Sequence, residues 1–165
     1  MGETPSRREL DFREFDAVLH DVDSLAAGGY DRVGNWDLAQ TCKHLADWMR
    51  YPLDGFPPAP LPIRLMLALV RNTVAPRMFR KVLEQRTMPG GSPTLPASVP
   101  PPGIDESAAI AELRQAIARF RNHEGPFHPS PLLGELDAET SKQAQLIHCA
   151  HHLSFLLPRA RRAVS

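Results

Sequence analysis

The sequence is poor in cysteine, has no excess of either charge and contains no long hydrophobic run. Two cysteines among 165 residues exclude a small domain held by many disulfides, and a reducing, cytoplasmic setting is the expectation. The 19 basic and 19 acidic residues balance, so no global positive field favours a nucleic-acid partner. The longest apolar run, Leu65–Val70, is far shorter than the ~18 residues that suggest a membrane span, so no stable span is expected.

Proline, in contrast, is abundant and unevenly distributed. Most of the 17 prolines lie between Pro52 and Pro102, whereas the composition of both ends is ordinary for a soluble protein. The length fits a single domain over residues 1–165. Within it, residues 88–104 are rich in proline and glycine and predict a long loop, and the basic stretch at 159–165 predicts a flexible tail.

Apolar residues recur at helical spacing in four principal segments, and alternating, strand-like patterns are few. Between the second and third segments, residues 63–85 predict a further helix that is kinked or broken at Pro76. The expected class is all-α: a four-helix bundle with an extra kinked helix and a long Pro-rich loop in its central connection. The principal helices are expected over about Phe12–Ala27, from a cap at Asn35 or Asp37 to before Gly55, from a cap at Asp105 through Phe120, and from a cap at Asp137 to about Leu157.

Two histidines of the last predicted helix form the best candidate for a metal site. His148 and His152 are four residues apart, so their imidazoles project from the same helix face and could hold one ion. His44, on the second helix, is the expected third ligand of a three-histidine site with open positions. His148 with His151 is a rival pair that spacing alone leaves open. The alternative interpretation is a solvated surface pair, because both histidines lie away from the centre of the helix's apolar stripe.

Four other side chains are secondary candidates. Cys42 and Cys149 adjoin the histidines in sequence, but residues one or two apart on a helix face different ways, so packing is their favoured role. Asp47 follows His44 by three residues and would either orient its imidazole or stay solvated. His128 would line the mouth of the bundle, cap a helix or occupy a turn. The remaining two histidines, His20 and His123, are expected to face solvent.

The segment Arg64–Arg86 is strongly basic and contains a single acid, Glu84, among interleaved apolar residues. A basic amphipathic helix of this kind can lie on a membrane surface or bind an acidic partner. The favoured interpretation is that its apolar side packs on the bundle and its charges are solvated.

Two stretches together resemble a known family. GNWDLAQTCKHLADWM, at 34–49, places a tryptophan shortly before a helical histidine and leucine, and it resembles the second-helix motif of DinB-like (YfiT-like) proteins. HPSPLLGELDAETSKQAQLIHCAHHLSFL, at 128–156, resembles the last-helix region of one uncharacterised group in that superfamily, domain of unknown function 1569. The resemblance covers most of the chain in the right order, apart from the Pro-rich centre.

The resemblance implies an up-down-down-up four-helix bundle that holds a divalent ion, zinc or nickel, on three histidines. Position by position these are His44, His148 and His152, with His152 favoured over His151 because it directly precedes the leucine. Characterised superfamily members include transferases and isomerases that use low-molecular-weight thiols. The implied function is therefore that of a bacterial-type, metal- and thiol-dependent transferase or hydrolase. Phe155 departs from the pattern, in which glutamine is common, and this bears on substrate chemistry.

Two alternatives to an enzyme stand beside this interpretation. A non-catalytic bundle that has kept the fold would serve as an interaction module, and the Phe155 departure and the Pro-rich insertion point that way. The other alternative is peripheral membrane attachment through Arg64–Arg86. For an enzyme, the expected partner is a small molecule such as a low-molecular-weight thiol, and a homodimer is an open alternative to a monomer.

Overall fold

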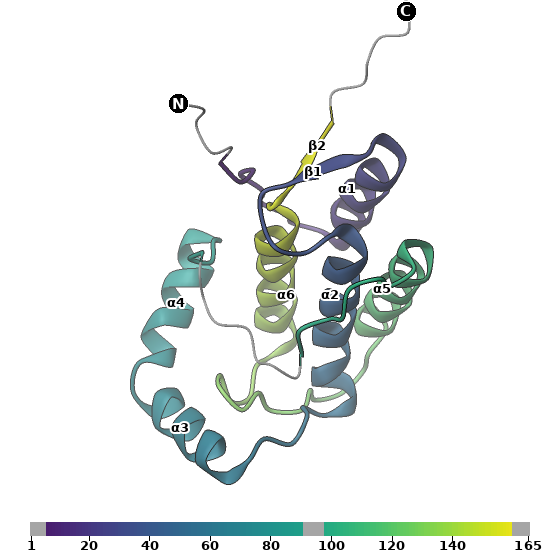
Figure 1. Cartoon of the computed structure of the whole chain (residues 1–165). Coiled ribbons are helices and arrows are strands. Elements are labelled where there is room, and N and C mark those ends of the chain that lie inside the picture. The colour runs from purple at the N-terminus through teal and green to yellow at the C-terminus, as the bar shows by residue number, and fades with distance from the viewer. Residues whose placement is uncertain (1–5, 91–97, 160–165) are drawn as a thin grey trace, which may run out of the picture.

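The computed structural model describes residues 6–90 and 98–159, and the fold is mostly helical (Figure 1). The predicted all-α class is confirmed in this broad sense, and the up-down-down-up order stays a prediction. A small two-stranded antiparallel sheet accompanies the helices. In chain order the elements of the described part are α1 (Phe15–Gly28), β1 (Tyr30–Arg32), α2 (Leu38–Asp54), α3 (Leu61–Asn72), α4 (Ala75–Gln85), α5 (Glu106–Arg121), α6 (Ala138–Leu153) and β2 (Leu156–Pro158).

Three of the main helices begin after an aspartate, as the sequence predicts. The carboxylates of Asp37, Asp105 and Asp137 each accept a hydrogen bond from the backbone N–H three residues further on, at 2.8, 2.7 and 2.8 Å. These bonds satisfy backbone donors that the first helical turn leaves without partners. Asp37 rather than Asn35 caps α2, and it forms a reciprocal capping box with Gln40 that defines where this helix starts.

Helices α1, α2, α5 and α6 contribute to one hydrophobic core. Figure 1 shows α2 between α6 and α5, and α2 makes its most extensive contact with α5. Each of these helices carries apolar side chains that become buried only when the helices pack together. The large core side chains that are fully buried include Val18, Val22, Leu25, Leu38, Leu45, Met49, Leu113, Ile117 and Leu153.

The last helix is shorter than predicted. It ends at Leu153 rather than near Leu157, and the chain then forms β2, which pairs antiparallel with β1. The apolar residues that prolong the helical pattern suit a strand equally well, and Leu156 packs into the core from extended backbone. The first helix also differs, since it begins at Phe15, and Phe12 enters the core from the segment before it.

The helix predicted over 63–85 is two helices. The break falls at Thr73 and Val74, and Pro76 lies in the first turn of α4. Proline is favoured there because the N–H that it lacks has no helical partner in that turn. Pro76 therefore helps to start a helix instead of kinking one. The described parts of the predicted loop, 88–90 and 98–104, contain no α-helix or strand; residues 91–97, and all but the first residue of the predicted tail, lie outside the described residues.

Helices α3 and α4 form an arm beside the core, here called the α3–α4 arm (Figure 1). α3 contacts α4, and α4 contacts α6. The expectation that the apolar side of this segment packs on the bundle holds only in part for α3: Leu67 and Val70 are half-buried, but no residue of this helix is fully buried. Within the described residues, no helix combines the length and hydropathy needed to cross a membrane.

Candidate metal centre

The structure brings together three histidines that are distant in sequence. His44 lies on α2, and His148 and His152 lie on α6. The Nε2 atom of His148 is 3.3 Å from Nε2 of His44 and 2.9 Å from Nε2 of His152. Each ring offers one nitrogen, and these nitrogens all lie within 4.8 Å of one another. These three residues, here called the histidine triad, surround a point that one small ion could occupy.

Local helical structure explains how the three rings meet. α2 packs against α6, and His44 lies on the buried side of α2, where it is only 1% exposed. In α6 the four-residue spacing aligns His148 and His152 on one face. Both remain half-buried, so the triad is enclosed on the α2 side and retains some contact with solvent on the α6 side.

Two tryptophans flank the triad. The ring of Trp36 stacks on His152, with centroids 5.2 Å apart and planes inclined by 15°, and lies 4.8 Å from the ring of His44. Trp48 meets His148 edge-on at 5.2 Å. The indole Nε1 of Trp48 is buried without a hydrogen-bond partner in the described part of the chain. These large flat rings restrict the imidazole orientations and displace water from around them.

A backbone carbonyl fixes the tautomer of His44. The Nδ1 atom of His44 is 2.8 Å from the carbonyl oxygen of Ser98. A carbonyl only accepts, so Nδ1–H donates this bond and Nε2 keeps its lone pair. Metal-binding histidines are commonly held in this way, with the non-ligating nitrogen hydrogen-bonded to a carbonyl or carboxylate.

Burial keeps the triad unprotonated. Removal from water lowers the pKa of His44, lowers the pKa of His148 well below its ordinary value, and lowers the pKa of His152 to about 2. For His148 and His152, repulsion from neighbouring imidazoles lowers the pKa further. The neutral imidazole is the form that binds a metal ion, so no proton must be displaced at neutral pH.

The triad fits a transition-metal ion such as zinc or nickel. Bonds of about 2.0–2.1 Å in a tetrahedral zinc site place the ligand nitrogens about 3.3 Å apart. Two of the three separations between ligand nitrogens, 3.3 and 2.9 Å, are close to this value, and all three lie within 4.8 Å. Imidazole is also a preferred ligand of zinc and nickel. Without an ion, a ring N–H of one histidine can donate to a neighbouring ring nitrogen at these distances, and a bound cation would take the nitrogen lone pairs instead.

His151 lies next to the triad but has different partners. Its ring is 4.9 Å from the ring of His152, and its Nδ1 lies 3.1 Å from the guanidinium of Arg7. Arg7 also donates to the carbonyl oxygen of Met88 and lies over the ring of Phe155. The geometry thus groups His152, rather than His151, with His44 and His148.

The secondary candidates have other roles. Asp47 does not orient His44, as one interpretation expected; it pairs with Lys43 at 2.5 Å and with Arg50 at 3.5 Å, while Ser98 takes the Nδ1–H of His44. The two cysteines are buried, and burial raises the pKa of the Cys42 thiol to about 12 and raises that of Cys149 as well. Neither belongs to the histidine triad.

The other histidines lie away from the triad. His128 is exposed and lies outside any turn; its backbone N–H donates to the carbonyl of Pro52, in the last turn of α2. His20 is exposed, and His123 is half-buried against Phe127. The carbonyl of Ser98, which accepts from His44, has no local signal in the sequence and was not predicted.

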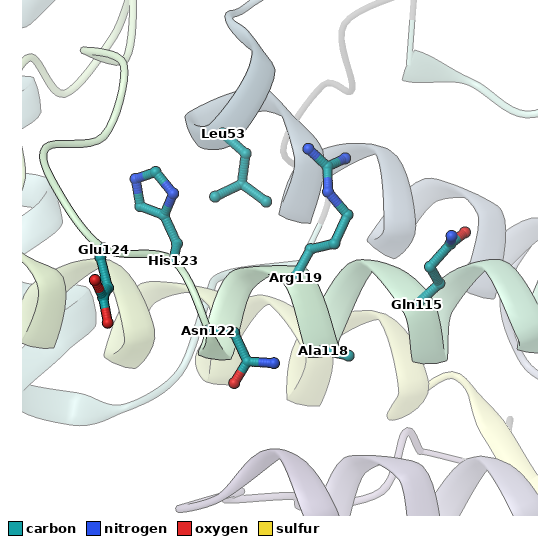
Figure 2. A pocket seen from close by; sticks show the side chains of 7 residues that line it. All are labelled: Leu53, Gln115, Ala118, Arg119, Asn122, His123 and Glu124. Carbon is teal, nitrogen blue, oxygen red and sulfur yellow. The ribbon is translucent and has the colours of Figure 1, made fainter.

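A surface pocket of about 470 Å³ lies between the ends of α2 and α5 (Figure 2). Its lining includes Leu53, Arg119, Asn122 and His123, and no triad histidine is among the residues that line it. The Arg119 guanidinium already pairs with Asp54, at 2.7 Å. This pocket is therefore separate from the candidate metal centre.

Comparison with protein families supplies a classification without a function. The sequence profile of the family described as "Protein of unknown function (DUF1569)" matches residues 4–159, which include the whole histidine triad. Neither the curated proteins nor the solved structures gave a match to the chain.

Proposed function

Since the chain belongs to the DUF1569 family, whose function is unknown, we propose a function from the histidine triad. The protein binds one divalent metal ion, zinc or nickel, through Nε2 of His44, His148 and His152. It acts as a metal-dependent transferase or hydrolase on a small molecule. The observation that carries this proposal is the convergence of the three imidazole nitrogens within 4.8 Å.

The surroundings of the triad support a metal site over a packing cluster. The Ser98 carbonyl fixes the His44 tautomer that leaves Nε2 free to bind. Trp36 and Trp48 hold the rings and exclude bulk water. Packing alone favours apolar side chains at such a place, because buried polar groups stabilise a fold only when they are fully satisfied.

A bound divalent ion would supply Lewis acidity that favours a thiolate or hydroxide at neutral pH. The chain's own residues would bind and orient that ion and shield it from water. Partial exposure of His148 and His152 leaves a side from which a small molecule can approach.

The substrate class follows from the resemblance to DinB-like proteins, to which we also assign the chain in this proposal. The tryptophan–histidine motif of α2 and the paired histidines of α6 support the assignment. A low-molecular-weight thiol is the proposed co-substrate. Phe155 stands where glutamine is common in the superfamily, and its ring contacts His151 and Arg7.

Calorimetric titration with zinc and with nickel, after chelator treatment, tests the metal site. We expect a loss of metal affinity of more than about 100-fold in each of His44→Ala, His148→Ala and His152→Ala. Such a loss exceeds the effect of removing a residue that is only hydrogen-bonded to a metal ligand. His128→Ala and His151→Ala are the matched controls and should leave the affinity unchanged. Equal and negligible binding by the native chain and the triad variants would contradict the proposal and favour a non-catalytic interaction module.

The proposal that a low-molecular-weight thiol binds the metal as co-substrate has a separate test. Cobalt(II) can replace zinc as a spectroscopic probe, and a thiolate that binds cobalt produces a strong charge-transfer absorption in the near ultraviolet. The cobalt-loaded protein should develop this band when a low-molecular-weight thiol is added, and His152→Ala should not. If cobalt binds but the band does not appear, the proposed metal site is retained and the proposed thiol co-substrate is contradicted.

A further inference from the structure

The α3–α4 arm exposes an apolar stripe to solvent. Leu61, Leu65 and Leu69 follow one another at one-turn intervals on α3 and are 63%, 64% and 66% exposed. Met66 and, on α4, Met78 are 55% and 60% exposed. Apolar side chains scattered over a surface need no explanation, but large ones gathered on one small element mark an interaction surface.

The same arm has an unbalanced positive charge. Arg64, Arg71, Arg77 and Lys81 form no ion pair with any described residue, and Arg80 approaches the only acid of the arm, Glu84, no closer than 3.8 Å. The pattern differs from that of α5, whose three arginines each pair with an aspartate of another helix: Arg114 with Asp23, Arg119 with Asp54 and Arg121 with Asp16.

We propose that the α3–α4 arm binds the surface of an anionic lipid bilayer. An exposed apolar stripe flanked by arginine and lysine is the pattern of a helix that lies in the membrane interface, with its apolar side among the acyl chains and its basic groups among anionic headgroups. The arm projects from the core, so it can reach a flat surface without displacing α1, α2, α5 or α6 (Figure 1). The attachment is peripheral and needs no membrane-spanning helix.

Charge complementarity selects lipid over a second copy of the chain. In a symmetric dimer the same patch meets itself, so the unpaired arginines of two arms would face one another and repel. A bilayer accommodates an exposed apolar stripe without a matching shape, whereas an acidic protein partner would need a complementary groove.

Co-sedimentation of the full chain with vesicles tests the proposal. The protein should bind vesicles of phosphatidylcholine with phosphatidylserine, and not vesicles of phosphatidylcholine alone. Because each basic residue near an anionic surface strengthens binding about fivefold, Arg64→Gln with Arg77→Gln should weaken it by roughly 25-fold. Leu65→Gln with Leu69→Gln should weaken it about tenfold or more through lost apolar burial.

A double variant away from the arm, Arg32→Gln with Arg114→Gln, removes the same charge and should bind like the native chain. Circular dichroism checks that every variant is folded. Absence of binding to phosphatidylserine vesicles, or equal binding by the arm variants and the native chain, would overturn the proposal. So would a dimer that Leu65→Gln with Leu69→Gln dissociates in light scattering, or binding to polyglutamate without binding to vesicles.

Discussion

The Nδ1 atom of His44 is hydrogen-bonded to the carbonyl of Ser98, 54 residues further along the chain. One turn earlier on α2, the side-chain amide of Gln40 donates to the carbonyl of Pro100 at 3.1 Å. Two side chains of α2 therefore hold the described end of the Pro-rich segment, and one of them belongs to the histidine triad. The position of this segment and the orientation of His44 are physically coupled.

This coupling predicts an effect of Gln40 on metal affinity. Gln40→Glu keeps the oxygen that accepts from the backbone N–H of Asp37 but loses the N–H that binds Pro100. We expect zinc affinity to fall about tenfold, the lower range for losing an outer partner of a ligand. Calorimetry measures it, with Asp54→Asn as the control because Asp54 pairs with Arg119 at the other end of α2. An unchanged zinc affinity in Gln40→Glu would show that the position of the Pro-rich segment does not affect the histidine triad.

Tryptophan fluorescence should report metal binding. The chain has two tryptophans, and both lie against triad rings, Trp36 on His152 and Trp48 on His148. A charge placed on these imidazoles changes the field at each indole, so adding zinc to the chelator-treated protein should shift or quench the emission. The change should saturate at one equivalent and be absent in His152→Ala. An unchanged spectrum during measurable zinc binding would place the metal elsewhere.

Stability without metal should fall as the pH falls below about 6.5. Burial lowers the pKa values of His44, His148, His151 and His152, the last to about 2. Below pH 6.5 the unfolded chain takes up protons that the folded chain does not. His148 and His152, whose pKa values are lowered most, should therefore each favour the unfolded state by about 1.4 kcal/mol per pH unit.

Urea unfolding at a series of pH values, in the presence of chelator, measures this dependence. His152→Ala should reduce the slope by about 1.4 kcal/mol per pH unit, because one buried site no longer titrates. His128→Ala removes an exposed histidine and should leave the slope unchanged. A free energy of unfolding that is flat between pH 7 and pH 5 would show that the triad is not buried in its neutral form.

Two leucines should differ sharply in their contribution to stability. Leu113 on α5 is fully buried, so Leu113→Ala should cost about 2–5 kcal/mol of the free energy of unfolding. Leu65 on α3 is 64% exposed, and Leu65→Ala should change the free energy of unfolding by less than about 0.5 kcal/mol. Urea denaturation measures both values. A large loss in Leu65→Ala would mean that the α3–α4 arm packs on the core after all.

Local signals in the sequence predicted the parts of the fold that have local causes. Aspartate caps located the starts of α5 and α6, and Asp37 is one of the two caps expected for α2, because the capping bond spans only three residues. The four-residue spacing of His148 and His152 likewise predicted a shared face. What the sequence did not predict depends on distant contacts. Leu156 joins a strand because β1 is available to pair with it, and no local pattern contains that information.

The α3–α4 arm shows a different limit of sequence reasoning. Its apolar spacing correctly predicted helix, but amphipathicity alone does not say what the apolar side contacts. Packing on the bundle was the ordinary expectation, and in α3 it is met only by half-buried residues such as Leu67 and Val70, while Leu61, Leu65 and Leu69 are exposed. The Ser98 carbonyl was missed for a related reason: a backbone acceptor has no sequence signature, and its position depends on how the Pro-rich segment returns to α2.

X-ray absorption at the zinc edge of the zinc-loaded protein tests the central claim most directly. The account predicts three imidazole nitrogens at about 2.0–2.1 Å, with the outer-shell scattering of histidine rings and no sulfur from the chain. His152→Ala should lose one of the three imidazoles. A first shell with fewer than three imidazoles in the native protein, or with a sulfur from Cys42 or Cys149, would contradict a site built from His44, His148 and His152.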